Sequence, residues 1–210
     1  YHNIMFALVE SGSITKMLSG NKGVTIGDIQ HPKQIFTIWT EAERNAIGIY
    51  TVEMDNSKKK DEKWYTNTNI TYTFSGGKVT GSYGDATAKA HANTTWTSQD
   101  KTDGKIPEGE DVGDVAVKGL KTILIEQVKS QAEGILNKTD WYVIRKADTD
   151  EAVPSSIATH RAAVRSKQAE QETAITNASD TPALETLYTY TEQEDGSVTR
   201  PLGELPTLED

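Results

Sequence analysis

The spacing of hydrophobic residues predicts β-structure in the first half of the chain. In residues 1–10 apolar side chains occupy both odd and even positions, which favours a strand that is covered on both faces. From Trp64 to Ala86 apolar and polar residues alternate, interrupted by a Ser-Gly-Gly-Lys turn signal at residues 75–78. We therefore expect an antiparallel β region with an aromatic hairpin, within an N-terminal domain of residues 1–96.

A short helix is expected inside this β region. Thr40 has the side chain of an N-cap residue, and Glu43 stands at the third helical position, where it completes a capping box. Gly48 is placed to end the helix in a left-handed conformation.

Residues 97–114 interrupt every periodic pattern. The stretch is rich in Gly, Asp, Lys and Glu, and it contains no regularly spaced apolar positions. This composition is typical of an exposed connection between domains, so we expect a polar linker there.

The chain beyond residue 114 has helical spacing. Apolar residues three and four apart predict an amphipathic helix over residues 115–137: Leu120, Ile123, Leu124, Val128, Ala132 and Ile135. Pro154 suits the first turn of a second helix that reaches about Asn177, and Pro182 begins a third. We expect a helical module over residues 115–190, then an acidic, proline-punctuated tail over residues 191–210. The predicted fold class is α+β.

The composition limits what such a protein can bind. A net charge of −9 over 210 residues opposes binding to nucleic acid through phosphate neutralisation. The hydrophobic share of 35% is low, which suggests surfaces that other chains cover. No apolar run approaches the roughly 18–20 residues that span a bilayer, so we expect no membrane insertion. The absence of cysteine removes disulfides and thiolate chemistry.

No group of residues has the spacing of an active site. The histidines at positions 2, 31, 91 and 160 lie too far apart in sequence to form a helical or hairpin metal pair. No pair of carboxylates is singled out by its neighbours. We expect no catalytic residues, no metal and no cofactor, and therefore no enzymatic activity.

Aromatic residues in the first half of the chain allow two interpretations. They can pack in the core, which is the commoner role of alternating aromatics, or they can line a groove that binds sugars. The residues concerned are Trp39, Trp64, Tyr65, Tyr72, Tyr83 and Trp96.

Residues 137–166 carry the most informative pattern. Trp141 and Arg145 are four apart, so on a helix the guanidinium can lie over the indole. Arg161 and Arg165 are also four apart, on the helix after Pro154, and their like charges repel unless acids lie nearby. Acids precede this helix at positions 140, 148, 150 and 151.

Two interpretations of this segment follow. In the first, Trp141 pins a helical hairpin that contacts between Asp and Arg hold together. In the second, one arginine points outward and meets a second chain. The sequence alone leaves both open.

The same segment resembles a known family. Residues 135–180 resemble the C-terminal module of phage tail assembly chaperones and tail-fibre-associated proteins, in which Thr-Asp-Trp leads through an Arg to a helix with the pattern Pro-x6-Arg-x3-Arg. The matching residues here are Asp140, Trp141, Arg145, Pro154, Arg161 and Arg165. Residues 31–53 are more weakly similar to the N-terminal region of marine phage proteins encoded among tail and fibre genes.

The resemblance implies a function in phage assembly. It implies a non-enzymatic structural or adaptor protein of the virion tail, present in the host cytoplasm during assembly, that binds other tail or fibre proteins within an oligomeric assembly. A transient tail-fibre assembly chaperone is the first alternative. A carbohydrate-binding receptor module, built on the aromatic residues, is the second.

Overall fold

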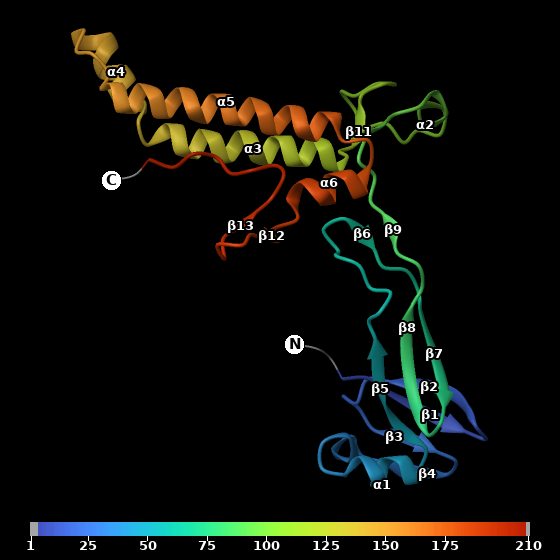
Figure 1. The fold of residues 1–210 in the computed structure, drawn as a ribbon. Coiled ribbons are helices and arrows are strands. Elements are labelled where there is room, and N and C mark those ends of the chain that lie inside the picture. The colour runs from blue at the N-terminus through green and yellow to red at the C-terminus, as the bar shows by residue number, and fades with distance from the viewer. Residues whose placement is uncertain (1–3, 209–210) are drawn as a thin grey trace. The chain divides into compact units, whose positions relative to one another are not determined.

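The structure is a computed structural model that describes residues 4–208 (Figure 1). It contains 36% helix and 24% strand, with a sheet in the N-terminal part and helices in the C-terminal part, so the predicted α+β class is confirmed. The chain divides into two compact units, residues 1–87 and residues 88–210. Each unit is described by itself below.

The first unit is built on a five-stranded sheet with the strand order β2-β1-β5-β8-β7. The strands are β1 (Phe6–Glu10), β2 (Ser13–Leu18), β5 (Ile49–Asp55), β7 (Ile70–Ser75) and β8 (Lys78–Tyr83). Neighbouring strands are antiparallel except β5 and β8, which are parallel. The expected antiparallel region therefore contains one parallel pair, because β5 is joined to β8 by a long connection rather than a tight turn.

Shorter elements complete the first unit. These are β3 (Val24–Ile26), β4 (Ile29–His31), the 3-10 helix η1 (Lys33–Phe36), α1 (Glu41–Ala46) and β6 (Tyr65–Thr66). Strand β9 (Thr87–Ala88) lies where the two units divide.

The core of the first unit explains the apolar run at the start of the chain. Phe6, Ala7 and Leu8 are all buried, which confirms that this part of the strand is covered on both faces. Residues 1–3, including His2, lie outside the described residues. The buried cluster joins β1 and β2 to the segments that follow them: Phe6, Leu8, Leu18, Val24, Ile35, Phe36 and Ile49.

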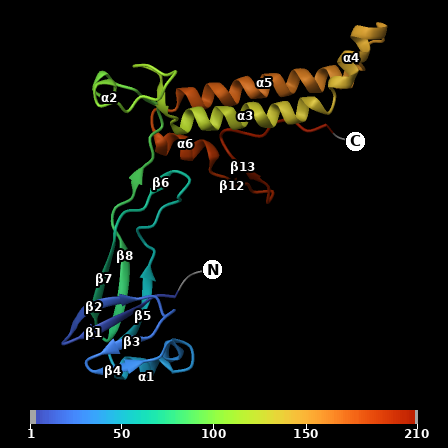
Figure 2. The same ribbon diagram turned by 180° about the vertical axis from the view of Figure 1, so that it is seen from behind.

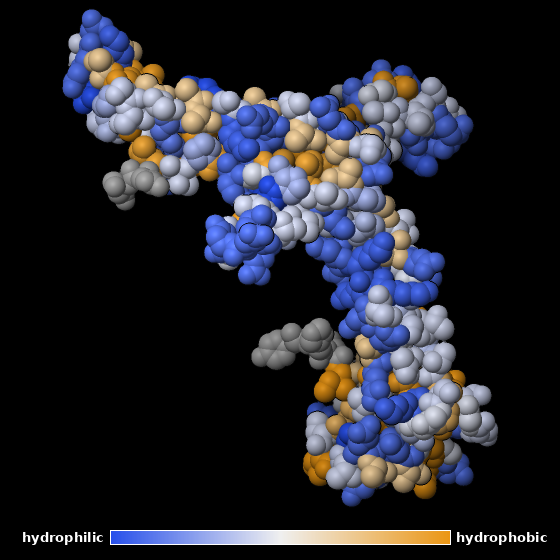
Figure 3. Space-filling view, in the orientation of Figure 1, coloured by the Kyte–Doolittle hydropathy of each residue, from blue (hydrophilic) through white to orange (hydrophobic). Residues whose placement is uncertain are grey.

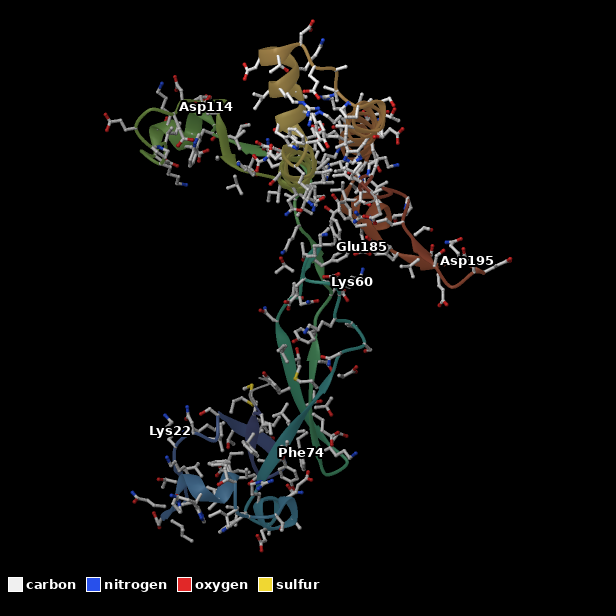
Figure 4. All side chains as sticks on the ribbon, turned by 90° about the vertical axis from the view of Figure 1, so that its left-hand side faces the viewer. Lys22, Lys60, Phe74, Asp114, Glu185 and Asp195 are labelled. Atoms are coloured by element: carbon white, nitrogen blue, oxygen red, sulfur yellow. The ribbon has the colours of Figure 1, made fainter. Side chains whose placement is uncertain are left out.

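The predicted hairpin and helix caps of this unit are confirmed. Strands β7 and β8 pair in register, and the Phe74 ring lies 4.9 Å from that of Tyr50 on β5 (Figure 4). Thr40 and Glu43 form the capping box of α1 through both reciprocal hydrogen bonds. Gly48 follows α1 in a left-handed conformation with φ +87°.

Residues 97–114 form a closed loop within the second unit. The linker between domains that their composition suggests is not what the structure shows. Strand β10 (Thr94–Thr95) precedes it and pairs with β11 (Val115–Val117), which follows it. The stretch contains the short helix α2 (Ser98–Thr102), capped by Thr97. Hydrogen bonds within the loop hold it in place. Because this order does not depend on regularly spaced apolar residues, the sequence pattern does not reveal it.

The second unit is centred on two long helices that lie side by side and antiparallel, α3 (Leu120–Asn137) and α5 (Ser155–Asn177) (Figure 2). Helix α4 (Asp140–Thr149) joins them, and α6 (Thr181–Tyr188) packs against α5. Helix α3 begins five residues later than expected. A side chain at Gly119 would collide with the backbone of Ala92, and residues 115–117 are held in β11 instead.

The interface between α3 and α5 contains both apolar and polar residues. Leu124, Val128 and Ala132 of α3 are buried, four residues apart. The buried residues of α5 lie along one side of the helix: Ile157, His160, Arg161, Val164, Gln171 and Ile175. Among the polar residues of this series, Arg161 and Gln171 form hydrogen bonds inside the unit.

The C-terminal residues up to Leu208 fold back on the helices, where the sequence suggested a tail. Strands β12 (Thr191–Glu192) and β13 (Val198–Thr199) form a small exposed hairpin, and Asp195 at its turn points away from the helices (Figure 4). Beyond the hairpin, Leu202 is buried at 3% exposure, and its backbone N–H donates to Leu187 O. Apolar burial therefore orders a segment whose overall composition is polar and acidic.

An aromatic clasp fastens the start of this segment. The Arg200 guanidinium lies 5.1 Å from the ring centroids of both Tyr188 and Tyr190, and its Nε is 3.0 Å from Glu204 Oε1. Tyr190 donates a hydrogen bond to the same carboxylate, which raises the pKa of Tyr190. Burial raises the pKa of Tyr188.

Substitution of Gly48 tests the first unit. A Cβ on Gly48 would lie 2.5 Å from Val9 O, whereas one on Gly76, also left-handed, would meet nothing within 4 Å. We expect Gly76→Ala to cost about 1–2 kcal/mol through backbone strain alone. Gly48→Ala adds a collision with the sheet backbone and is expected to cost at least about 3 kcal/mol. Urea unfolding followed by circular dichroism measures the stability of both variants. Equal losses of unfolding free energy would show that position 48 is not restricted by the backbone of Val9.

Candidate functional site

Arg161 joins three helices at the end of the α3–α5 pair. Its Nη1 atom lies 2.9 Å from Asp140 Oδ1, at the first residue of α4. The same nitrogen donates to Leu136 O in the last turn of α3 and to Thr139 Oγ1, both at 2.8 Å. Arg161 is 8% exposed and Thr139 is 2% exposed. One buried guanidinium thus ties the turn between α3 and α4 to α5.

The contacts of Arg161 and of its neighbours bear on the two interpretations of residues 137–166. The expected clamp between Asp and Arg is present at Asp140 and Arg161. Trp141 is 51% exposed, so about half of it is in contact with the rest of the unit. Arg165 is exposed and forms no ion pair or hydrogen bond within residues 4–208, so it is an outward-facing arginine. Pro154 is exposed and directly precedes α5.

Helix α4 presents an exposed apolar surface. None of its residues is buried, and three apolar side chains are exposed to solvent: Trp141 at 51%, Val143 at 44% and Ile144 at 61%. We call these three residues the α4 surface. Figure 3 shows hydrophobic residues reaching the molecular surface at this end of the helical pair. Exposed apolar side chains gathered on one short helix can mark a site that another molecule covers.

Stacking orders the aromatic part of this surface. The rings of Trp141 and Tyr142 are stacked, with centroids 3.8 Å apart. The Arg145 guanidinium lies 4.9 Å from the Trp141 centroid, which confirms the contact expected from their spacing, and pairs with Glu151 at 3.3 Å. The rings are therefore held in place before any partner arrives, which lowers the entropy cost of binding.

A cavity of about 390 Å³ opens at the base of α4. Its walls come from α3, α4, α5 and the C-terminal segment, and include Ile135, Trp141, Tyr142, His160, Thr207 and Leu208. His160 is 8% exposed, and its Nε2 atom is buried with no hydrogen-bond partner among residues 4–208. Polar groups of Lys138, Thr139, His160 and Thr207 share this lining with the aromatic and aliphatic side chains, so the cavity is mixed in character.

The six aromatic residues singled out in the sequence do not form one surface. Trp64 and Tyr65 are buried at 3% and 7% exposure, so core packing is their role. Trp39 packs against the core cluster of the first unit. Trp96 belongs to the second unit, whereas the others, including Tyr72 and Tyr83, belong to the first. A sugar-binding groove would therefore lack Trp64 and Tyr65, while Tyr72 and Tyr83 are half-buried.

Sequence reasoning missed two residues of this region. Thr139 is buried through tertiary contacts that no local pattern shows. Leu208 lines the cavity although it lies in the predicted tail. A signal for it was present, since Leu202, Leu205 and Leu208 recur at every third position.

Within residues 4–208 no group of three or more His, Cys, Asp or Glu side chains is arranged to hold a metal ion. None of the helices in the described part of the chain combines the length and the apolar character needed to cross a bilayer. Comparison with known proteins found no matching family model, no matching curated protein and no matching solved structure.

Removal of the Arg161 side chain tests its role. Arg161→Met leaves Thr139 and the Leu136 carbonyl without their buried donor, so we expect a loss of about 2–4 kcal/mol of unfolding free energy. Arg165→Met is the matched control on the same helix and is expected to change stability by less than about 0.5 kcal/mol. Thermal and urea unfolding distinguish the two. Similar effects of both substitutions would show that Arg161 is not the anchor.

Proposed function

We propose that this chain is a non-enzymatic structural or adaptor protein of a phage tail that binds other tail or fibre proteins through the α4 surface. The observation that carries the proposal is the combination of a buried anchor and an exposed face on one short helix. Arg161 holds the first residue of α4, while Trp141, Val143 and Ile144 remain open to solvent.

The physical basis is preorganisation. Binding energy at protein interfaces concentrates in a few aromatic and aliphatic side chains that become fully desolvated. Trp141 is already stacked on Tyr142, and the Arg145 guanidinium lies near both rings, so little side-chain freedom remains to be lost. Val143 and Ile144 on the same helix are exposed apolar side chains that a partner can cover.

The assignment to a phage tail has a separate basis. It rests on the resemblance of residues 135–180 to tail chaperones and tail-fibre-associated proteins. Of the residues that carry this resemblance, Asp140 and Arg161 meet in the anchor, Trp141 and Arg145 stack, and Arg165 faces outward. A binding module needs some residues that hold its fold and others that are exposed to the partner. This segment contains residues of both kinds.

Incorporation into virions tests this proposal. We expect the chain to be present in purified phage tails by mass spectrometry. Ile144→Glu places a charge in the centre of the α4 surface and is expected to reduce incorporation at least about tenfold, since burying an unpaired carboxylate opposes binding. Ile29→Glu, at a residue of the first unit that is 62% exposed, is the matched control and should incorporate normally.

The outcomes separate the alternatives. Absence of the unaltered chain from mature particles, together with fibre proteins that stay soluble only when co-expressed with it, would replace the structural role with that of a transient chaperone. Normal incorporation of Ile144→Glu would show that the α4 surface is not the binding site.

A further inference from the structure

A second cavity, of about 310 Å³, lies at the end of β2 in the first unit. Its walls come from the last residues of β2 and from the turn at residues 19–23, which leads into β3. Among the described residues that line it, Lys16 and Lys22 are charged and none is a carboxylate. This volume is at the lower end of the range for small-molecule sites, so the cavity suits one small chemical group.

The two lysines of this cavity have no partner within residues 4–208. Both are exposed, and neither forms an ion pair or a hydrogen bond there. At least eight other lysines pair with carboxylates of the chain, which carries a net charge of −9. The charges of Lys16 and Lys22 therefore remain available to an anion from outside.

The turn at residues 19–23 adds backbone donors to the same cavity. Gly20, Lys22 and Gly23 line it, and their backbone N–H groups donate no hydrogen bond within the described part of the chain. Successive free N–H groups of a turn form concavities that bind anions, phosphate among them. The Ser19 hydroxyl closes the turn by donating to Asn21 Oδ1.

Close packing holds this turn in place. A Cβ on Gly20, which has φ +77°, would lie 2.9 Å from the ring of Phe6 in the core cluster. A Cβ on Gly23 would lie 2.5 Å from His31 O of β4. The backbone of the turn thus lies directly on the core and on a neighbouring strand. Its donors are fixed before a ligand arrives, which lowers the entropy cost of binding.

We propose that this cavity binds the phosphate group of a small phosphomonoester. Such a group carries close to two negative charges and three acceptor oxygens, which match two ammonium groups together with the donors of the turn. A carboxylate has one charge and two oxygens, so it satisfies fewer of these groups. The side chains of Met5 and Met17 line the cavity beside the lysines and can contact the organic part of the ester.

The sequence of the turn limits the ligand to a single phosphate group. A nucleotide-binding P-loop ends in Gly-Lys-Ser/Thr and leads into a helix, whereas Lys22 is followed by Gly23 and then by strand β3. The turn therefore has no helix N-terminus behind it to bind a second phosphate. The net charge of −9 likewise opposes polyphosphates and nucleic acid.

Titration of the isotopically labelled full chain with phenyl phosphate, followed by two-dimensional NMR at constant ionic strength, tests the site. We expect the amide signals of Gly20, Lys22 and Gly23 to shift and to reach saturation. Benzoate has the same ring but a single charge, so we expect it to bind at least about fivefold more weakly.

Substitution of both lysines provides the matched comparison. Lys16→Gln combined with Lys22→Gln should weaken the binding of phenyl phosphate at least about tenfold, because two charged donors are lost. Lys33→Gln combined with Lys78→Gln removes the same charge from exposed positions of the first unit outside the cavity and should bind like the unaltered chain. All four lysines are exposed, so both variants should keep the dispersed spectrum of the folded chain.

Three results would each overturn the proposal. Phenyl phosphate would leave the amide signals of the turn in place, benzoate would bind as tightly as phenyl phosphate, or the two double variants would lose affinity equally. Ile144→Glu changes the second unit and should leave the titration unchanged. Failure of the phosphate site is thereby distinguishable from failure of the α4 surface.

Discussion

The buried guanidinium of Arg161 is the interaction on which the functional end of the second unit depends. It meets a carboxylate from α4, a hydroxyl from the turn and a carbonyl from α3, so that three elements share one donor group. A charge at 8% exposure is tolerated only with such partners, since an unpaired buried guanidinium would cost several kcal/mol. The direction of α4 therefore follows from an electrostatic requirement.

This anchor allows α4 to remain apolar on its outer side. A short helix normally gains its stability by burying one face, and α4 buries none. Its first residue is held by the ion pair, and its last turn closes on Asp150, which has a left-handed conformation and binds Lys146. The helix is stabilised at its two ends, and Val143 and Ile144 between them are exposed to solvent.

The cavity at the base of α4 adds a second feature to the same end of the unit. Trp141 belongs both to the α4 surface and to the cavity wall. A molecule that occupied the cavity would therefore change the environment of a residue on the α4 surface.

The sequence by itself determined the classes of element and most of their positions. Alternation specified the β7–β8 hairpin, and the spacing of apolar residues specified α3 and α5, because these patterns reflect which face of an element is buried. Local chemistry likewise determined the capping box of Thr40 and the stack of Arg145 on Trp141. Only the tertiary structure decided that Arg161 is the anchor while Arg165 faces outward, and that Trp64 and Tyr65 belong to the core. It also placed residues 201–208 against the helices and closed residues 97–114 into a loop. These outcomes depend on which distant groups meet, and contacts between residues far apart in the chain leave no periodic trace in the sequence.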